Sequence, residues 1–303
     1  MNEYLNIIKE VYGNYAGYIW DEITFSVSPW YVNYFWWLIV LSLVVWGVEI
    51  IFPWRKEQAI IRKDFWLDAF YMFFNFYVFA LFISGFYAIV ELTVQNMGYS
   101  TGALAIINIQ EMPIWLGLLI FFILNDLVQW FTHVLLHRYN WMWRFHKVHH
   151  SVEQMGFAAH LRYHWMENIF YKPLKTLVVM ILVGGEPSDA FFIHYFAIAI
   201  GHLNHANLNL DYGPLKYIFN NPKMHIWHHA LTLPSDRKNG VNYGISLSIW
   251  DYIFRTSYIP ESGRDIELGF PGLSNFPSSF LGQAMYGFVP DESSSESSES
   301  VTH

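Results

Sequence analysis

The chain has 303 residues, of which 54% are hydrophobic, 20% aromatic and only 14% charged. Soluble domains usually carry about 25% charged residues, so this composition argues against an ordinary soluble enzyme and excludes a disordered or collagen-like protein. The formal net charge of -8 gives little support to a nucleic-acid-binding surface. The absence of cysteine excludes disulfides, thiolate metal sites and a cysteine nucleophile.

Two long apolar runs predict membrane-spanning helices. Residues 33–52 are interrupted only by Glu49, and residues 69–90 carry no charge. Each run is long enough to cross a hydrocarbon core of about 30 Å. A third run, residues 114–136, has the right length but carries several polar residues in its second half. We therefore expect three spans.

The third run carries a polar stripe. Asp126, Gln129, His133 and His137 follow one another at steps of three or four, so they share one face of a helix. In lipid this face must point into the protein or a cavity, because an exposed carboxylate costs about 2.5 kcal/mol or more. A helix that leaves the bilayer early is the plainer alternative. We favour a functional stripe, because its last two members begin a series of clustered histidines.

The positions of the cations predict the orientation in the membrane. Of the 17 Lys and Arg residues, four lie between Arg55 and Lys63, none from residue 64 to 137, and twelve after His137. The positive-inside rule then places the loop near Arg55 and the chain after His137 on the cytoplasmic side. Two shorter apolar stretches, residues 174–183 and 190–200, fit a re-entrant pair, a helical hairpin or buried core helices.

Histidine is the unusual residue of this sequence. Thirteen of its 14 copies lie between His133 and His229. On a helix, residues at steps of three and four project from one face, so neighbouring imidazoles can converge on a metal. Three clusters have this spacing: His133 with His137; His146 with His149 and His150; and His225 with His228 and His229.

These eight histidines predict a binuclear metal centre. One ion usually takes three or four protein ligands, so eight exceed the needs of a single site. Neutral nitrogen donors suit iron, zinc, copper or nickel and disfavour magnesium or calcium. The carboxylates expected to balance or orient the ligands are Asp126, Glu153 and Glu167.

Several other residues keep more than one interpretation. Asn207, Asn242 and Tyr243 suit hydrogen-bonded turns as well as groups that orient ligands. His160 and His202 are equally suited to ligation, to orienting a ligand and to packing. His194 lies in an apolar stretch and is expected to be a core residue.

Four segments resemble the fatty acid hydroxylase and sterol desaturase superfamily. They are HVLLHRYNWMWRFHKVHHS (133–151), HWME (164–167), HANLNL (205–210) and NNPKMHIWHHA followed by NYGISLSIWDYIF (220–254). The resemblance implies an integral-membrane oxygenase with two iron ions (Fe2+/Fe3+), which uses O₂ and two electrons to hydroxylate or desaturate a lipid. It also implies ten metal ligands: His133, His137, His146, His149, His150, His164, His205, His225, His228 and His229.

The sequence departs from the family pattern at positions that touch no implied ligand. Val134 stands where the family often has Arg, Trp165 where it often has Pro, and Arg255 where it usually has Gly. These departures bear on the subfamily and substrate more than on the metals. The chain carries no fused haem-binding cytochrome domain, so the resemblance implies a separate electron-transfer protein as partner.

The predicted fold is all-α: a multi-span membrane helical bundle with a cytoplasmic-side helical cap that holds the histidine-rich dimetal site. We expect an N-terminal membrane region (1–113), a di-iron oxygenase region that includes the third span (114–260), and a C-terminal extension (261–303) with a disordered acidic, Ser-rich tail. A multi-pass protein of a bacterial inner membrane or an ER membrane, with a bilayer lipid as substrate, fits these features.

Three other functions compete with the oxygenase. A zinc-dependent membrane hydrolase would need a carboxylate beside the metal, as in His-Glu-x-x-His, and the sequence has no such motif. A metal transporter or metal-binding store would spread its ligands through several spans. A haem protein with two axial histidines would place them on separate long spans, unlike the clusters found here.

Overall fold

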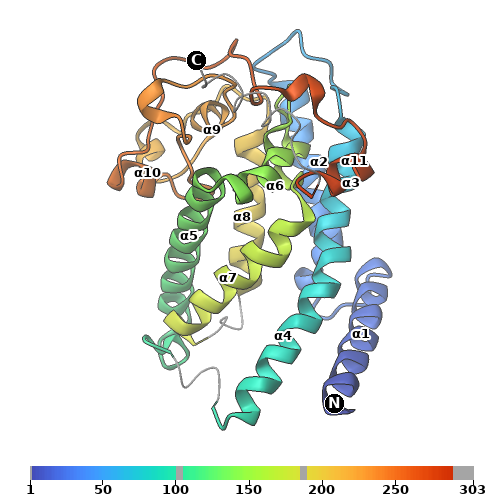
Figure 1. Ribbon diagram of the computed structural model, residues 1–303. Coiled ribbons are helices and arrows are strands. Elements are labelled where there is room, and N and C mark those ends of the chain that lie inside the picture. The colour runs from blue at the N-terminus through green and yellow to red at the C-terminus, as the bar shows by residue number, and fades with distance from the viewer. Residues whose placement is uncertain (1, 100–104, 185–189, 289–303) are drawn as a thin grey trace, which may run out of the picture.

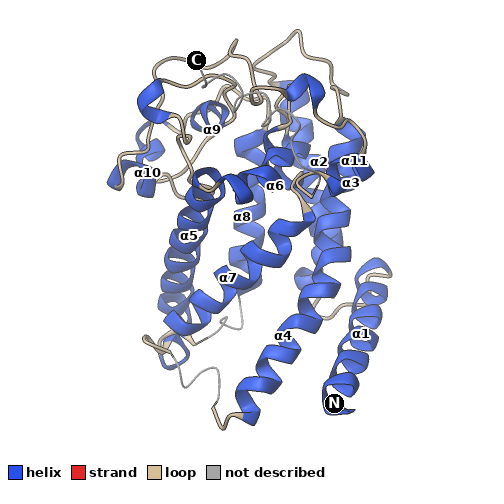
Figure 2. Ribbon diagram, in the orientation of Figure 1, coloured by secondary structure: helices blue, strands red, loops and turns tan. Residues whose placement is uncertain are grey.

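The computed structural model describes residues 2–99, 105–184 and 190–288, and these are helical with no β-strand among them (Figures 1 and 2). Its α-helices are α1 (Asn2–Ile23), α2 (Tyr34–Ile51), α3 (Phe65–Phe73), α4 (Phe79–Asn96), α5 (Ile114–Arg138), α6 (Asn140–His150), α7 (Trp165–Val183), α8 (Ala190–His205), α9 (Pro222–His228), α10 (Ile249–Ile253) and α11 (Phe280–Met285). This confirms the all-α prediction for the described residues.

Three helical segments are long and apolar enough to cross a membrane: α2, residues 65–96 and α5. They correspond to the three predicted spans. The side chain of Asn33 caps α2 by accepting a hydrogen bond from the Trp36 backbone N–H at 3.0 Å. At its other end α2 stops at Ile51, two residues before Pro53, because a proline cannot continue the hydrogen-bond ladder.

The second span contains a π-helical turn, η2 (Phe74–Val78), between α3 and α4. Single π-turns inside α-helices often occur at functional sites, because they change the direction of one or two side chains. Here the amide of Asn75 donates to the carbonyl oxygens of Leu161 at 3.0 Å and Tyr163 at 2.9 Å. The turn therefore fixes residues 161–163, whose Arg162 carbonyl bonds His149.

The two shorter apolar stretches form α7 and α8, which both contact α5 but otherwise pack on different neighbours. α7 lies against α5, α4 and α6, whereas α8 lies against α2, α9 and the 3-10 helix η5 (Phe157–Leu161). They are therefore separate members of the bundle rather than a hairpin packed on itself. α1, for which the sequence analysis made no prediction, lies alongside α4 (Figure 1).

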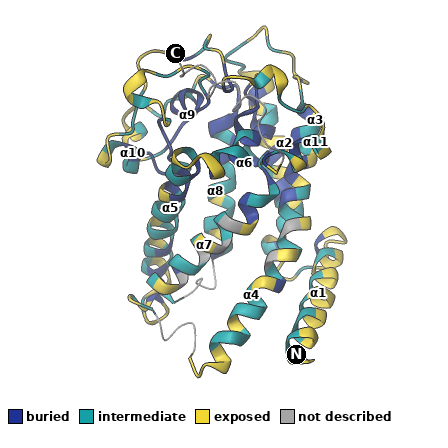
Figure 3. Ribbon diagram, in the orientation of Figure 1, coloured by how far each residue is buried: buried dark blue, intermediate teal, exposed yellow. Residues whose placement is uncertain are grey.

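A cap of loops and short helices covers one end of the bundle, and the most deeply buried residues lie beneath it (Figure 3). The loop after α2 joins this cap, because the Trp54 N–H donates to the Asn207 carbonyl at 2.9 Å. The described part of the predicted C-terminal extension joins it too. Gly269 N–H donates to the His229 carbonyl at 3.0 Å, and the Tyr71 hydroxyl donates to Gln283 Oε1 at 3.1 Å. The predicted acidic tail falls in residues 289–303, outside the described residues.

Candidate metal centre

Nine histidines converge beneath the cap in two groups. The five-histidine group takes two residues from α5, two from α6 and one from α9: His133, His137, His146, His150 and His228. The four-histidine group takes residues from α6 and α8, from α9 and from the residue after it: His149, His205, His225 and His229. Within each group the possible ligand atoms lie within 4.8 Å of one another. The groups adjoin where the rings of His150 and His229 stack with centroids 4.4 Å apart.

Backbone carbonyls fix the tautomers of four of these rings. The Nδ1–H groups of His133 and His228 donate to Tyr243 and Val241 carbonyls, both at 2.8 Å. In the four-histidine group, His149 Nδ1–H donates to the Arg162 carbonyl at 3.0 Å and His205 Nδ1–H to the Gly201 carbonyl at 2.8 Å. A neutral imidazole that donates from Nδ1 keeps a bare lone pair on Nε2, which is the form that binds a metal.

A carboxylate fixes the tautomer of His146. Glu167, on the first turn of α7, is buried, and its Oε2 lies 3.2 Å from His146 Nδ1. A carboxylate on the far nitrogen of a ligating histidine fixes its orientation and increases its basicity. This is the role expected for one of the three predicted carboxylates.

The bare Nε2 atoms of these rings face one another. His133 Nε2 lies 3.2 Å from His146 Nε2, and His149 Nε2 lies 3.4 Å from His205 Nε2. Each pair brings two lone pairs together with no proton to share, because the Nδ1 atoms hold the protons. Two adjacent ligands at about 2.1 Å from one ion would lie about 3.0 Å apart at a right angle and about 3.4 Å apart at the tetrahedral angle. The arrangement fits a cation in each group.

The protonation state and one orphaned atom agree with this fit. Burial holds the pKa of His149, His150 and His225 well below its usual range, so these imidazoles are neutral at pH 7, as metal ligation requires. His228 Nε2 is buried without a hydrogen-bond partner among the described residues, although buried polar atoms usually have one. A metal ion would satisfy it.

Two buried aspartates organise the chain behind the five-histidine group. Asp251 accepts hydrogen bonds from the Tyr243 and Gly244 backbone N–H groups at 2.9 and 2.8 Å, and from Trp130 Nε1 at 3.0 Å. It therefore holds the carbonyl that orients His133. Asp126, a predicted carboxylate, accepts from Leu247 N–H at 3.2 Å and Trp250 Nε1 at 3.0 Å. It anchors this loop to α5 and touches no clustered histidine.

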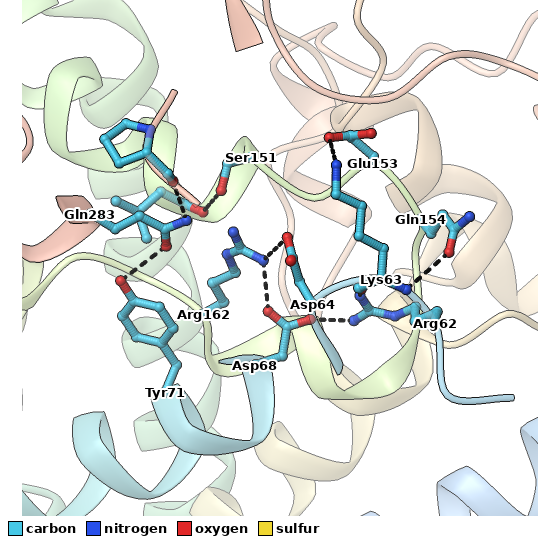
Figure 4. A network of polar contacts seen from close by, with 12 residues as sticks. Arg62, Lys63, Asp64, Asp68, Tyr71, Ser151, Glu153, Gln154, Arg162 and Gln283 are labelled. Atoms are coloured by element: carbon cyan, nitrogen blue, oxygen red, sulfur yellow. Dashed lines mark hydrogen bonds and ion pairs between the residues drawn. The ribbon is translucent and has the colours of Figure 1, made fainter. Parts of the chain in front are cut away.

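A buried ion network supports the four-histidine group from the other side (Figure 4). The Asp68 carboxylate bridges the guanidinium groups of Arg62 and Arg162, and Arg162 also pairs with Asp64 at 3.2 Å. Asp68 and Arg162 are almost fully buried. Because the Arg162 carbonyl accepts from His149, the network fixes one ligand candidate through the backbone. No local signal in the sequence predicts this network, because Arg162 lies 94 positions after Asp68 in the chain.

The remaining predicted groups lie farther from the rings. Glu153 lies at the surface, in an ion pair with Lys63 whose side chains are 48% and 56% exposed, and it is not brought to the histidines. Asn207 exchanges hydrogen bonds with the Arg55 backbone at 2.9 and 3.1 Å. Asn242 donates to the Met224 carbonyl at 2.8 Å, so it holds α9 in place.

His164 lies outside both groups. Its Nε2–H donates to the Ala284 carbonyl at 2.9 Å, and its Nδ1 accepts from the Met166 N–H at 3.0 Å. Both ring nitrogens are therefore used within the protein. The resemblance had placed a ligand here, whereas the structure gives His164 the geometry of a residue that ties α7 to the C-terminal segment.

The histidines with open interpretations form a second layer. His202 bonds Ser42 Oγ at 3.1 Å through Nε2 and His160 Nδ1 at 3.0 Å through Nδ1. The His160 ring lies 5.3 Å from that of His205, next to Gly201, where a Cβ atom would meet the ring at 2.1 Å. His194 packs among rings, as expected of a core residue, with Phe121 at 6.4 Å.

A cavity of about 170 Å³ opens beside both groups. It is bounded by α5, α6, η5, α7 and α8, and rings of both groups line it, including His133, His146 and His205. The polar stripe of α5 reaches it through Gln129 and His133. A ligand in this cavity would touch both histidine groups, which makes it the candidate substrate pocket.

The region that contains the histidines matches a known protein family. Residues 118–256 match the sequence model of the family described as fatty acid hydroxylase. That match contains all nine clustered histidines and confirms the resemblance noted from the sequence.

Characterised relatives align with the same region. An ornithine lipid hydroxylase from Rhizobium tropici is 33% identical over 142 residues, which cover 46% of this chain and 41% of the relative. Alkylglycerol monooxygenases from Danio rerio and Homo sapiens are 33% and 32% identical, and the match covers 46% and 42% of this chain and 30% and 27% of the relatives. The alignments thus span less than half the length of these relatives. No solved structure matches the chain.

Proposed function

We propose, from the premise that residues 118–256 form a fatty acid hydroxylase domain, that this chain is an O₂-dependent lipid oxygenase with two iron ions. The five-histidine group would hold one ion and the four-histidine group the other. The observation that carries the proposal is the facing of bare Nε2 atoms in both groups, at 3.2 and 3.4 Å. When bound, the iron pair supplies the activation of O₂ that attack on an unactivated C–H bond requires.

The protein's own contribution is positioning and desolvation. Carbonyls and Glu167 hold five of the nine imidazoles in the ligating tautomer, which reduces the reorganisation needed when the metals bind. Burial keeps bulk water away from the reaction site. The lipid would enter between α5 and α7 and place a C–H bond against the rings that line the cavity. His164 is left out of the ligand set, because both of its ring nitrogens are used in the protein.

Hydroxylation is the reaction supported best, because the aligned relatives are a lipid hydroxylase and monooxygenases. We propose that the three apolar helices span the bilayer and that the cap faces the cytoplasm, following the distribution of cations. The division into residues 1–113, 114–260 and 261–303 stays part of the proposal. A separate electron-transfer protein would supply the two electrons.

Metal analysis of the purified protein tests the proposal. We expect two iron ions per chain and consumption of O₂ when a reductant and membrane lipids are added. Iron-free protein with one zinc ion that hydrolyses a lipid would support the hydrolase instead. Two ions without any lipid oxidation would support a metal-binding protein. Comparison of lipids from cells with and without the gene identifies the product.

A further inference from the structure

A cleft of about 470 Å³ opens into the cap and reaches the five-histidine group. Three histidines of that group line it: His137, His150 and His228. None of these three is among the described residues that line the candidate substrate pocket. The metal centre therefore has a second opening, which reaches different histidines. We call this opening the cap cleft.

The cap cleft uncovers the edge of one predicted ligand. His137 is only partly buried, whereas the other eight clustered histidines are buried. Gly240 also lines the cleft, with a φ of +112°, and a Cβ atom there would lie 3.0 Å from His137 Nδ1. The missing side chain thus leaves this ring edge open. The ring of Trp143, another lining residue, lies 4.9 Å from that of His137. A molecule in the cleft therefore contacts a ring that would hold iron.

The surface around the cap cleft is positively charged. A smaller cleft shares two lining residues with it, and the charged residues that line the two clefts are four bases and one acid: Arg138, Arg237, Lys238, Arg255 and Asp236. The single carboxylate pairs with Arg237 at 3.9 Å. The other three bases are exposed and form no ion pair with a carboxylate of the described residues. We call these three the basic rim, and they attract an acidic surface.

One member of the basic rim has a backbone conformation that favours glycine. Arg255 directly follows the C-cap residue of α10, and its φ of +60° lies in the left-handed region. Glycine is the usual residue at this position of a helix end, because a Cβ atom is crowded in that conformation. Strained residues of this kind cluster at functional sites. A function for the charge explains why an arginine stands there.

Resting on the proposed function, we infer that the cap cleft is the docking site of the electron-transfer protein, which presents an acidic face to the basic rim. Hydroxylation of one C–H bond takes up O₂, two electrons and two protons, and it yields the alcohol and one water. A one-electron carrier must therefore dock and leave twice per turnover. Encounters of electron-transfer proteins are small and transient and are guided by charge, which suits an exposed rim around a ring edge. The lipid occupies the other opening, so carrier and substrate do not compete.

Reduction of the iron by two reductants of opposite charge tests the docking site. A plant-type ferredoxin, which is acidic, is the protein probe, and reduced methyl viologen, a small cation, is the control. We expect ferredoxin to reduce the iron about tenfold or more slowly at about 0.5 M salt than at low salt, because salt screens exposed charges. Methyl viologen should not be slowed. Reduction by ferredoxin at the same rate in both salts would overturn the inference.

Paired variants locate the effect on the surface. Arg138→Gln combined with Lys238→Gln should slow reduction by ferredoxin about tenfold or more without slowing reduction by methyl viologen. Lys9→Gln combined with Lys56→Gln also removes two exposed charges, but neither residue lines the two clefts, so both rates should be kept. A rim variant as fast as the unmodified protein, or a control variant as slow as the rim variant, would contradict the assignment.

The substitution Arg255→Gly separates docking from stability. Reduction by ferredoxin should become severalfold slower, whereas thermal unfolding should occur at the same or a higher temperature, because glycine adopts the left-handed conformation without strain. Slower reduction together with a lower unfolding temperature would show a structural role and count against the basic rim.

Binding of oxidised ferredoxin to metal-free protein in neutral detergent makes the test independent of iron. Affinity that falls with salt and in the double rim variant supports the docking site even where no iron binds and the proposed function fails. Protein that holds iron and oxidises lipid, but binds ferredoxin equally in the double rim variant or not at all, overturns this inference alone. Loss of affinity for dihexanoylphosphatidylserine in that variant, with ferredoxin affinity kept, would assign the rim to anionic lipid and also overturn the inference.

Discussion

The two histidine groups share α6 and α9, but the first adds α5 and the second adds α8, and they differ in the number of histidines and in what supports them. The five-histidine group rests on α5, where two ligand candidates lie one turn apart, and is held by Glu167 and by the loop that Asp251 organises. The four-histidine group takes single residues from α6 and α8 and is held by the ion network of Asp68. An ion with four protein ligands keeps more open positions than an ion with five.

Because of this difference, we expect the two groups to respond differently to loss of one histidine. One more ligand makes the five-histidine group tolerant of a lost imidazole. In the four-histidine group, His149 depends on the carbonyl of Arg162, and through it on the buried charges of the ion network.

Neighbouring residues on α6 allow the sharpest test. His149→Ala removes a ligand from the four-histidine group and His150→Ala one from the five-histidine group. We expect each to lower lipid oxidation by more than about 100-fold, because even outer partners of metal ligands cost 10–100-fold. The His149→Ala variant should lose the iron of the four-histidine group. The His150→Ala variant should keep more of the iron of the five-histidine group, because four histidines remain there.

X-ray absorption identifies which ion remains. The mean number of nitrogen neighbours of the remaining iron should be higher in His149→Ala than in His150→Ala. Equal numbers, or loss of both ions from both variants, would show that the groups do not act as separate sites.

Among the ion pairs of the described residues, those of Asp68 should contribute most to the free energy of unfolding. Asp68→Asn leaves the buried Arg62 and Arg162 without their shared carboxylate, so the free energy of unfolding should fall by about 3–5 kcal/mol. Thermal unfolding in detergent measures the loss. Asp265→Asn, which breaks an exposed pair with Arg264, is the control and should change little. Equal losses in the two variants would contradict a stabilising role for the network.

The contact of Glu167 with His146 should have a smaller effect, confined to the five-histidine group. Glu167→Gln keeps the shape but removes the charge, and we expect metal affinity or lipid oxidation to fall by about 10–100-fold. Competition with a chelator measures the affinity. Loss of the ion of the four-histidine group instead would contradict the assignment of this carboxylate.

The smallest effect is expected at Glu153. Its ion pair with Lys63 is exposed, so Glu153→Gln should change the free energy of unfolding by no more than about 1 kcal/mol and leave the metal content unchanged. Loss of iron in this variant would show that Glu153 does support metal binding.

Much of the fold follows from the sequence, because its signals are local. The apolar runs predicted the three long helices, since length and hydropathy are properties of one segment. The arrangement of α7 and α8 did not follow, because it depends on which neighbours each helix meets. Nor did the π-turn at residues 74–78, whose Asn75 bonds residues 161 and 163.

For the metal centre, spacing predicted which histidines share a helix face but not how they divide between two groups. His149 and His150 are adjacent yet belong to different groups, because successive residues of α6 project in different directions, His150 toward the histidines of α5 and His149 toward that of α8. The same limit applies to the carboxylates: Glu153 is three residues from His150 but points to solvent, whereas Glu167 reaches His146.

The position of α6 between the groups has a consequence for assembly. One rigid helix of 11 residues carries ligands for both ions, so an ion bound in one group restricts the motion of the ligands in the other. The second ion then meets a lower entropic cost than the first. We expect metal uptake to be cooperative, with fully loaded and empty chains outnumbering half-loaded ones when iron is scarce.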